Sequence, residues 1–198
     1  MFEFIEYIGI IAFAISGFLI GVKNSLDLLG VIISMFLTAL GGGLIRDVIL
    51  QKVPYSFNHT IPALLIILVF IVMYIFKLYN KNLEDNFWFI LSDSLGLVAF
   101  SISGATLAIE AEYNLTGVLA LAFISGVGGG IVRDIIINEV PFIFKSGFYG
   151  TVTLITAFFL HIFSILDCLN YFTIIIIFII ATLLRLIAYY KSWNIPKL

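Results

Sequence analysis

The sequence predicts an all-α integral membrane protein with seven transmembrane helices, arranged as two inverted three-helix repeats plus one C-terminal helix. Three observations lead to this fold class. The 198-residue chain is 62% hydrophobic and only 11% charged, with a mean hydropathy of +1.19, whereas soluble domains are about 45–50% apolar and about 25% charged. Its apolar segments have the length of about 20 residues that crosses a bilayer. A glycine-rich motif in the second segment returns in the fifth.

Seven segments are long and apolar enough to span a membrane as helices. They cover residues 4–22, 28–50, 61–79, 88–109, 115–137, 148–166 and 171–190. These segments use most of the chain, so we expect one membrane domain over residues 1–198 with no soluble domain. The N-terminal region at the start of the first segment carries Glu3 and Glu6 rather than lysine or arginine. We therefore interpret it as a span and not as a secretory signal.

The motif Gly-Gly-Gly-x-x-Arg-Asp begins at Gly41 and again at Gly128, 87 residues later. The same offset aligns, without a gap, the segments 13–17 and 100–104 and the pairs 53–54 and 140–141. Shared hydrophobicity does not explain why glycine, proline and charged positions all coincide. The sequence therefore predicts an internal duplication.

The duplication divides the chain into a first three-helix repeat at 4–80 and a second at 88–167. The seventh helix, 171–190, has no counterpart, and we expect it to be an accessory packing helix. A repeat with an odd number of spans returns to the membrane from the opposite side, so the two repeats are predicted to be inverted. Inverted repeats place a transport pathway at their interface near the bilayer midplane.

Lysine and arginine predict the orientation of the chain. Eight of them follow spans 1, 3 and 5 or lie near the C-terminal end, namely Lys23, Lys77, Lys81, Arg133, Lys145, Arg185, Lys191 and Lys197. The opposite side holds only Arg46 and Lys52. By the positive-inside rule, we expect a multi-pass cell-membrane protein with its N-terminus outside and its C-terminus in the cytoplasm.

Spans 1 and 4 each carry an acid and a serine on one helical face. Glu6 and Ser16 are ten residues apart in the first repeat, as are Asp93 and Ser103 in the second. An acid followed by small and hydroxyl residues suits a cation path, with Glu6 at the outer mouth and Asp93 at the cytoplasmic mouth. The alternative is that the small residues only allow close helix packing, with solvated acids at the span ends.

Spans 2 and 5 carry the glycine triplets, which are Gly41, Gly42 and Gly43, and Gly128, Gly129 and Gly130. Each triplet is expected to kink or unwind its helix, exposing carbonyls that could coordinate a transient K⁺ or Na⁺ ion. Each is followed by a charged pair, Arg46-Asp47 or Arg133-Asp134. These residues are predicted to pair with each other or with the arginine of the other repeat. The alternative is tight packing at glycine beside a structural ion pair.

Several classes of function lack support in the sequence. Cys168 is the only cysteine, which excludes an internal disulfide and a cysteine-based metal site. The sequence has no nucleotide-binding loop, catalytic triad or metal cluster. We therefore expect neither an enzyme nor a cofactor, no fixed metal and no nucleic-acid partner.

The two three-span repeats, each with Gly-Gly-Gly-x-x-Arg-Asp and a later proline, resemble the prokaryotic trimeric intracellular cation (TRIC) channel family. The resemblance covers nearly the whole chain. It implies a homotrimer in membrane lipid, with a pore in each subunit lined by kinked second and fifth helices and conducting monovalent cations, chiefly K⁺. The glycine triplets would then be the kink points beside the pore, and Arg46, Asp47, Arg133 and Asp134 polar residues at it.

Three functions remain compatible with the sequence. The leading hypothesis is a channel in which each subunit conducts K⁺, and Na⁺ less well, between the repeats. The second is a carrier of a small amino acid such as glycine, because some bacterial relatives in this broader family are linked to glycine uptake and inverted repeats are common in secondary transporters. The third is a membrane scaffold without transport.

Overall fold

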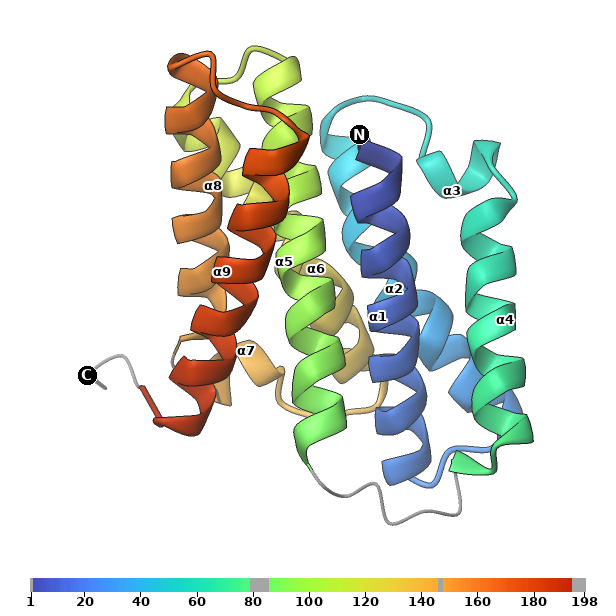
Figure 1. Ribbon diagram of the computed structural model, residues 1–198. Coiled ribbons are helices and arrows are strands. Elements are labelled where there is room, and N and C mark those ends of the chain that lie inside the picture. Colours follow the sequence, from blue (N-terminus) through green and yellow to red (C-terminus); the bar gives the residue numbers. More distant parts are fainter. Residues whose placement is uncertain (1, 79–85, 146–147, 194–198) are drawn as a thin grey trace.

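The computed structural model describes residues 2–78, 86–145 and 148–193, and over these ranges the secondary structure is entirely helical (Figure 1). The helices of these described ranges are α1 (Phe2–Lys23), α2 (Leu28–Ile49), α3 (Tyr55–Asn58), α4 (Ile61–Ile75), α5 (Asn86–Glu110), α6 (Leu115–Ile136), α7 (Phe142–Lys145), α8 (Tyr149–Ile165) and α9 (Tyr171–Tyr190). The all-helical fold expected from the sequence is confirmed.

Five of these helices, α1, α2, α5, α6 and α9, are long and apolar enough to cross a membrane. Helices α4 and α8 are apolar but have only 15 and 17 residues, fewer than the third and sixth segments predicted. Helix α4 ends at Ile75 because Lys77 adopts a left-handed backbone conformation with a φ of 52°. Residues 79 and 80, which close the predicted span and repeat, lie outside the described residues, as do Lys81 and Lys197.

The 87-residue offset holds for local structure as well as for sequence. Helices α6 and α7 begin and end 87 residues after α2 and α3. The caps repeat too, since Asp27 accepts a hydrogen bond from the Gly30 N–H at 2.7 Å and Asn114 accepts one from the Gly117 N–H at 2.9 Å. Such N-caps satisfy amide groups that a helix start leaves without partners.

The prolines that follow the two motifs do not end the long helices. Helix α2 ends at Ile49, and Gln51 turns the chain with a φ of 55°; Asn138 does the same after α6 with a φ of 59°. Pro54 lies beyond this turn, at the N-cap of α3. The helix ends are therefore set by a left-handed residue, and the proline starts the short helix that follows.

The glycine triplets do not unwind their helices. Both α2 and α6 are continuous α-helices through the triplets, so the unwinding considered for them does not occur. Instead the two triplets face each other. A Cβ atom on Gly41 would lie 3.4 Å from the Cα of Gly129, and one on Gly128 would lie 3.1 Å from the Cα of Gly42. The lost helix propensity, about 1 kcal/mol for each glycine, is offset by close backbone contact between the helices.

The centre of the molecule is formed by α1 and α5, which lie side by side and run in opposite directions (Figure 1). Phe13 of α1 stacks on Phe100 of α5, with ring centroids 5.4 Å apart and an interplanar angle of 15°. Gly9 and Gly96 make room for these rings, because a Cβ atom on Gly9 would approach Phe100 to 2.9 Å and one on Gly96 would clash with Phe13.

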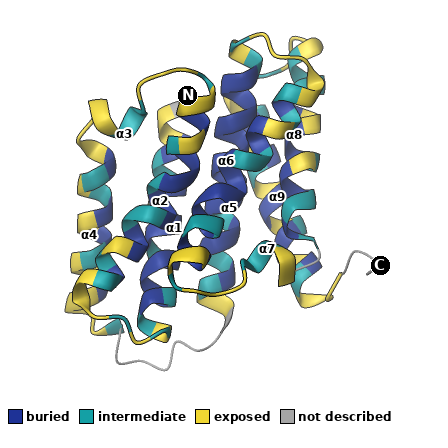
Figure 2. Ribbon diagram, turned by 180° about the vertical axis from the view of Figure 1, so that it is seen from behind, coloured by how far each residue is buried: buried dark blue, intermediate teal, exposed yellow. Residues whose placement is uncertain are grey.

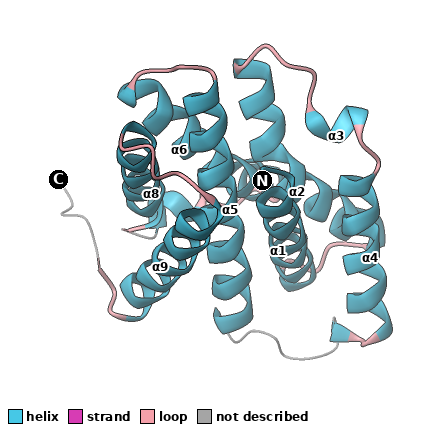
Figure 3. Cartoon of the chain, turned by 45° about the horizontal axis from the view of Figure 1, so that its top comes forward, coloured by secondary structure: helices cyan, strands magenta, loops and turns pink. Residues whose placement is uncertain are grey.

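The remaining helices surround this pair. Buried residues follow α5 along most of its length, whereas α4 and α9 present exposed apolar residues outward (Figure 2). In the tilted view, α8 and α9 lie on one side of α1 and α5, and α3 and α4 on the other (Figure 3). The exposed apolar surface of a membrane protein faces lipid or another subunit, as expected for a chain of this composition.

The close contact between α2 and α6 at the two triplets, which we call the glycine crossing, predicts different effects of substitution at two neighbouring glycines. A Cβ atom on Gly42 would collide with the Ser125 carbonyl oxygen, whereas one on Gly43 would approach nothing closer than 3.4 Å. We expect Gly42→Ala to lower the free energy of unfolding by about 1–3 kcal/mol, the usual effect of overpacking. Gly43→Ala is the matched control. It should not lower the free energy of unfolding, because its Cβ atom has room and alanine favours the helix by about 1 kcal/mol. Unfolding of the detergent-solubilised protein measures both, and equal loss in the two variants would contradict the crossing.

Candidate functional site: two buried arginine centres

Arg46, near the end of α2, is fully buried and bound by acids of its own half of the chain. Its Nε donates to Asp47 Oδ1 at 2.8 Å, and its second terminal nitrogen donates to Glu6 Oε1 of α1 at 3.0 Å. The other terminal nitrogen donates to the Ser103 hydroxyl of α5. We call this group of four residues the first arginine centre.

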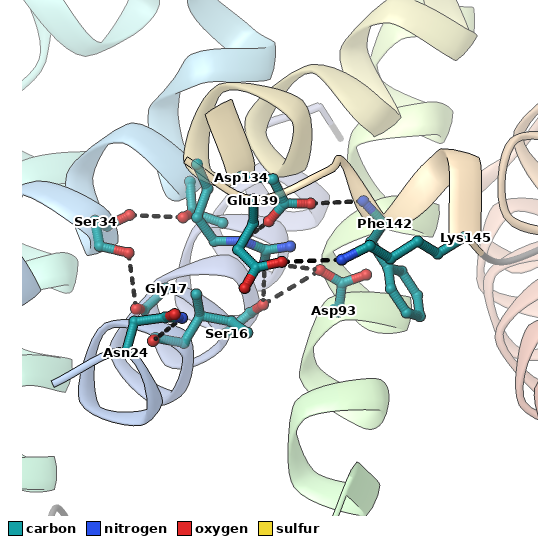
Figure 4. Close-up of polar contacts among 12 residues, drawn as sticks. Ser16, Gly17, Asn24, Ser34, Asp93, Asp134, Glu139, Phe142 and Lys145 are labelled. Carbon is teal, nitrogen blue, oxygen red and sulfur yellow. Dashed lines mark hydrogen bonds and ion pairs between the residues drawn. The ribbon is translucent and has the colours of Figure 1, made fainter. Parts of the chain in front are cut away.

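Arg133, at the equivalent place on α6, has an equivalent set of partners. Its Nε donates to Asp134 Oδ1 at 2.8 Å, and one terminal nitrogen donates to Asp93 Oδ1 at 3.0 Å and to the Ser16 hydroxyl at 2.7 Å. Ser16 in turn donates to Asp93 Oδ1 at 3.2 Å. Figure 4 shows Ser16 and Asp93 pointing toward one another in this second arginine centre.

The two centres connect the halves of the chain. Each arginine binds acids from its own half, but its serine comes from the other half, Ser103 for Arg46 and Ser16 for Arg133. A buried arginine is strongly destabilising unless its donors are paired. Each half of the chain therefore depends on the other to complete its own centre.

The aspartates of the two motifs also fix the short helices. Asp47 Oδ2 accepts the Tyr55 N–H at 2.8 Å. Asp134 Oδ2 accepts the Phe142 N–H at 2.7 Å, a contact that Figure 4 shows. The Tyr55 hydroxyl lies 2.7 Å from that of Tyr7 on α1. Desolvation, and then this hydrogen bond, raise the pKa of Tyr55 far above its ordinary value, so that it remains a neutral phenol.

The structure thus brings together the sequence-predicted charged residues. Of the two pairings predicted for Asp47 and Asp134, the one with the neighbouring arginine of the same motif is observed, and the one with the arginine of the other repeat is not. Glu6 and Asp93 are 3% and 1% exposed, so the alternative of solvated acids at the span ends is not observed. Each is held inside by an arginine that follows the glycine triplet of its own half.

Two residues of the second centre were not predicted. Arg185 of α9 is 1% exposed, and its guanidinium lies over the rings of Tyr149, at 5.0 Å from the centroid, and of Phe142, at 5.7 Å. Tyr149 of α8 is 2% exposed. One signal for Arg185 was present, because an ionisable residue within an apolar span usually has a specific role.

The first centre borders a cavity with about 220 Å³ of empty space, including its opening. Residues of α1, α2, α3 and α4 line it, together with Phe100 of α5. Glu6 and Asp47 contribute carboxylates to the lining, and Tyr55 and Ser56 lie on it from α3. Within the described ranges, no group of three histidine, cysteine or acidic side chains is arranged to hold a metal ion.

Comparison with known proteins places this geometry in a family. A family model described as a glycine transporter matches residues 3–78 and 90–164, one block in each half of the chain. The UPF0126 membrane protein YvgT of Bacillus subtilis (strain 168) is 32% identical over 204 residues, which cover 98% of this chain and 95% of YvgT.

Two solved structures are similar over nearly their full length. One, from work on the structural basis for conductance through TRIC cation channels, has a TM-score of 0.85 and 36% identity and covers 100% of this chain and 97% of its own. The other, a prokaryotic TRIC channel in 0.5 M KCl, has a TM-score of 0.89 and 30% identity and covers 98% of each chain. The chain therefore belongs to the prokaryotic TRIC family, with which the UPF0126 relatives and the glycine-transporter model agree, and this is a family of membrane channels and not of enzymes.

Proposed function

We propose that this chain is a monovalent-cation channel that prefers K⁺, with a pore in each subunit between its two halves near Gly41–Gly43 and Gly128–Gly130. The observation that carries the proposal is the pair of arginine centres on either side of the glycine crossing. A chain that buries three arginines and four acids within apolar helices does so at a large desolvation cost. In membrane proteins, such residues usually mark an ion pathway.

The chemistry of the centres favours cations over anions. Each motif arginine lies between two carboxylates, Arg46 between Glu6 and Asp47 and Arg133 between Asp93 and Asp134. The arginine charges are therefore compensated locally, while carboxylate and serine oxygens remain to line a path. Acidic side chains and oxygen dipoles are the groups that select cations in channels.

The halves are proposed to be inverted repeats, over residues 4–80 and 88–167, with α9 as the seventh transmembrane helix. The antiparallel course of α1 and α5, and of α2 and α6, supports this arrangement (Figure 1). Equivalent helices with opposite directions are what an inverted duplication of a three-span unit produces. On this proposal, α4 and α8 complete the two units despite their shorter lengths.

The proposed orientation has the N-terminus outside and the C-terminus in the cytoplasm. Arg46, Arg133 and Arg185 are buried, so they do not contribute to the charge of the loops. Without them, six lysines remain on the side of the C-terminus and one, Lys52, on the other. The positive-inside rule therefore gives the same orientation from lysines alone.

A homotrimer is the proposed assembly, as in the channels that give the TRIC family its name. The apolar outer faces of α4, α8 and α9 offer surface for lipid or for other subunits. Lysines on the cytoplasmic side would favour anionic lipid headgroups there.

A second candidate function is transport of a small amino acid such as glycine. The family model that matches both halves of this chain carries that description. In such a carrier, one half would rock against the other around a midplane site, with saturable flux and no unitary current.

Electrical recording separates these two functions. We expect the purified protein in a planar bilayer, under a KCl gradient, to show discrete openings that reverse near the K⁺ equilibrium potential, because the path would be lined by acidic and hydroxyl oxygens. Replacing K⁺ by Na⁺ should lower the unitary current. A silent bilayer, with saturable glycine uptake into liposomes from the same preparation, would contradict the channel and support the carrier.

Labelling of single cysteines tests the orientation. In a Cys168→Ser background, Lys52→Cys should react with a membrane-impermeant maleimide on intact cells, because its loop is proposed to face outward. Lys191→Cys, just after α9, should react only after the membrane is permeabilised. The reverse pattern would overturn the orientation, and both positions are exposed, so access within the protein is matched.

Cross-linking in native membranes tests the assembly. Amine-reactive cross-linkers should give bands up to a trimer, since each subunit is proposed to contact two others. A series that ends at the dimer at saturating reagent would contradict the trimer while leaving a pore within each subunit intact.

A further inference from the structure

We propose that the cavity beside Glu6 binds one monovalent cationic group, either an alkali ion or the ammonium group of a small amino acid, and that the equivalent place beside Asp93 binds none. The inference rests on the proposed function, since it locates a cation site within the proposed pathway. It adds that the duplicated chain has a single such site, at one end only.

The first argument is an unused carboxylate oxygen. Glu6 Oε1 accepts from Arg46, but Oε2 is buried and has no hydrogen-bond partner among the residues that the structure describes. The side chain is 4% exposed and lines the cavity. A buried carboxylate oxygen without a partner is strongly unfavourable. A cation in the cavity would satisfy it.

The second argument is local charge. Glu6 and Asp47 against Arg46 leave one negative charge beside the cavity. In the second half, Arg133 pairs with both Asp93 and Asp134, and a further positive charge, that of Arg185 on α9, lies over the ring of Tyr149 within electrostatic range of Asp93. Helix α9 has no counterpart in the first half, so only the first centre keeps an excess negative charge. That excess attracts a cation rather than an anion or a neutral ligand.

The third argument is space. By the 87-residue offset, Pro62 on the cavity wall corresponds to Tyr149. The Tyr149 hydroxyl lies where a Cβ atom on Gly130 would be 3.4 Å away, and the residue is 2% exposed. Gly43, the counterpart of Gly130, lines the cavity, and the atom nearest to a Cβ there would be a ring carbon of Phe100 at 3.4 Å rather than a tyrosine hydroxyl. On this comparison, the side chain of Tyr149 takes the place in the second half that Pro62 leaves to the cavity in the first.

The residues that line the cavity are also more polar than their counterparts in the second half. Tyr55 and Ser56, which carry hydroxyl groups, line the cavity. Their counterparts in the second half, Phe142 and Ile143, carry none. The empty space of about 220 Å³ includes the opening of the cavity, and its enclosed part has room for about one water-sized sphere. That space suits a single alkali ion, which is about the size of a water molecule, or an ammonium group that enters from the opening.

Infrared difference spectroscopy of the full-length protein in lipid vesicles tests this site without requiring conduction. Exchange of N-methylglucamine for K⁺ should shift a carboxylate band, and Glu6→Gln should remove the shift while keeping a hydrogen bond to Arg46. Pro62→Tyr, which copies the second half, should weaken apparent K⁺ affinity at least about tenfold, or about 1.4 kcal/mol. Ser56→Ile is a milder copy that keeps the test valid if Pro62→Tyr does not fold.

Asp93→Asn is the matched comparison and should retain the K⁺-dependent shift. A second exchange, in which glycine replaces K⁺ at constant N-methylglucamine, distinguishes the two sources of the cationic group. A shift with glycine alone would support the site with an ammonium occupant. The inference is overturned if neither exchange changes a carboxylate band, if the shift survives Glu6→Gln, or if Asp93→Asn abolishes it equally. A protein that conducts K⁺ without the band shift would refute the site but not the channel.

Discussion

The burial of Arg46 and Arg133 is the constraint on which the rest of the structure depends. Each guanidinium lies inside an apolar bundle, where an unpaired charge is among the most unfavourable groups a membrane protein can contain. Each is therefore bound by two acids from its own half and by a serine from the other. Because the aspartates also hold the short helices through backbone N–H groups, one pair of arginines fixes the contact between the halves and the position of α3 and α7.

The glycine crossing and the arginine centres require each other. Arg46 and Arg133 lie one helical turn after the triplets. The distance between α2 and α6 at the triplets therefore sets how far each arginine lies from the helices of the other half. A side chain on Gly42 or Gly129 would separate the helices at this point. The serines would then move away from the arginines, and a buried donor left unsatisfied costs about 1–3 kcal/mol. The motif is therefore a single unit of packing and charge rather than two adjacent features.

The sequence predicted most of this fold because its signals were local or periodic. Hydropathy located the long helices, and the 87-residue offset anticipated that α6 and α7 would repeat α2 and α3. Propensity failed at the triplets, because it counts the instability of glycine within one helix and not the contact with a second helix. The pairing of Ser103 with Arg46 could not be predicted either, since it depends on the packing of two helices far apart in sequence. Arg185 was misread as a charge near a helix end because hydropathy does not show which face of α9 is buried.

Helix α9 makes the charge and the space of the two arginine centres unequal. A simple duplication would produce two identical centres, and a cation between them would meet two equally attractive sites. Arg185 removes the negative excess of the second centre, and Tyr149 occupies its space. Conduction requires binding that is strong enough for an ion to enter but weak enough for it to leave. On the proposed pathway, one attractive site followed by a neutral centre would meet both conditions, because the ion would be concentrated at the first half and would not be held again at the second. Helix α9, which is not repeated, would then make the energy profile along the proposed pathway asymmetric.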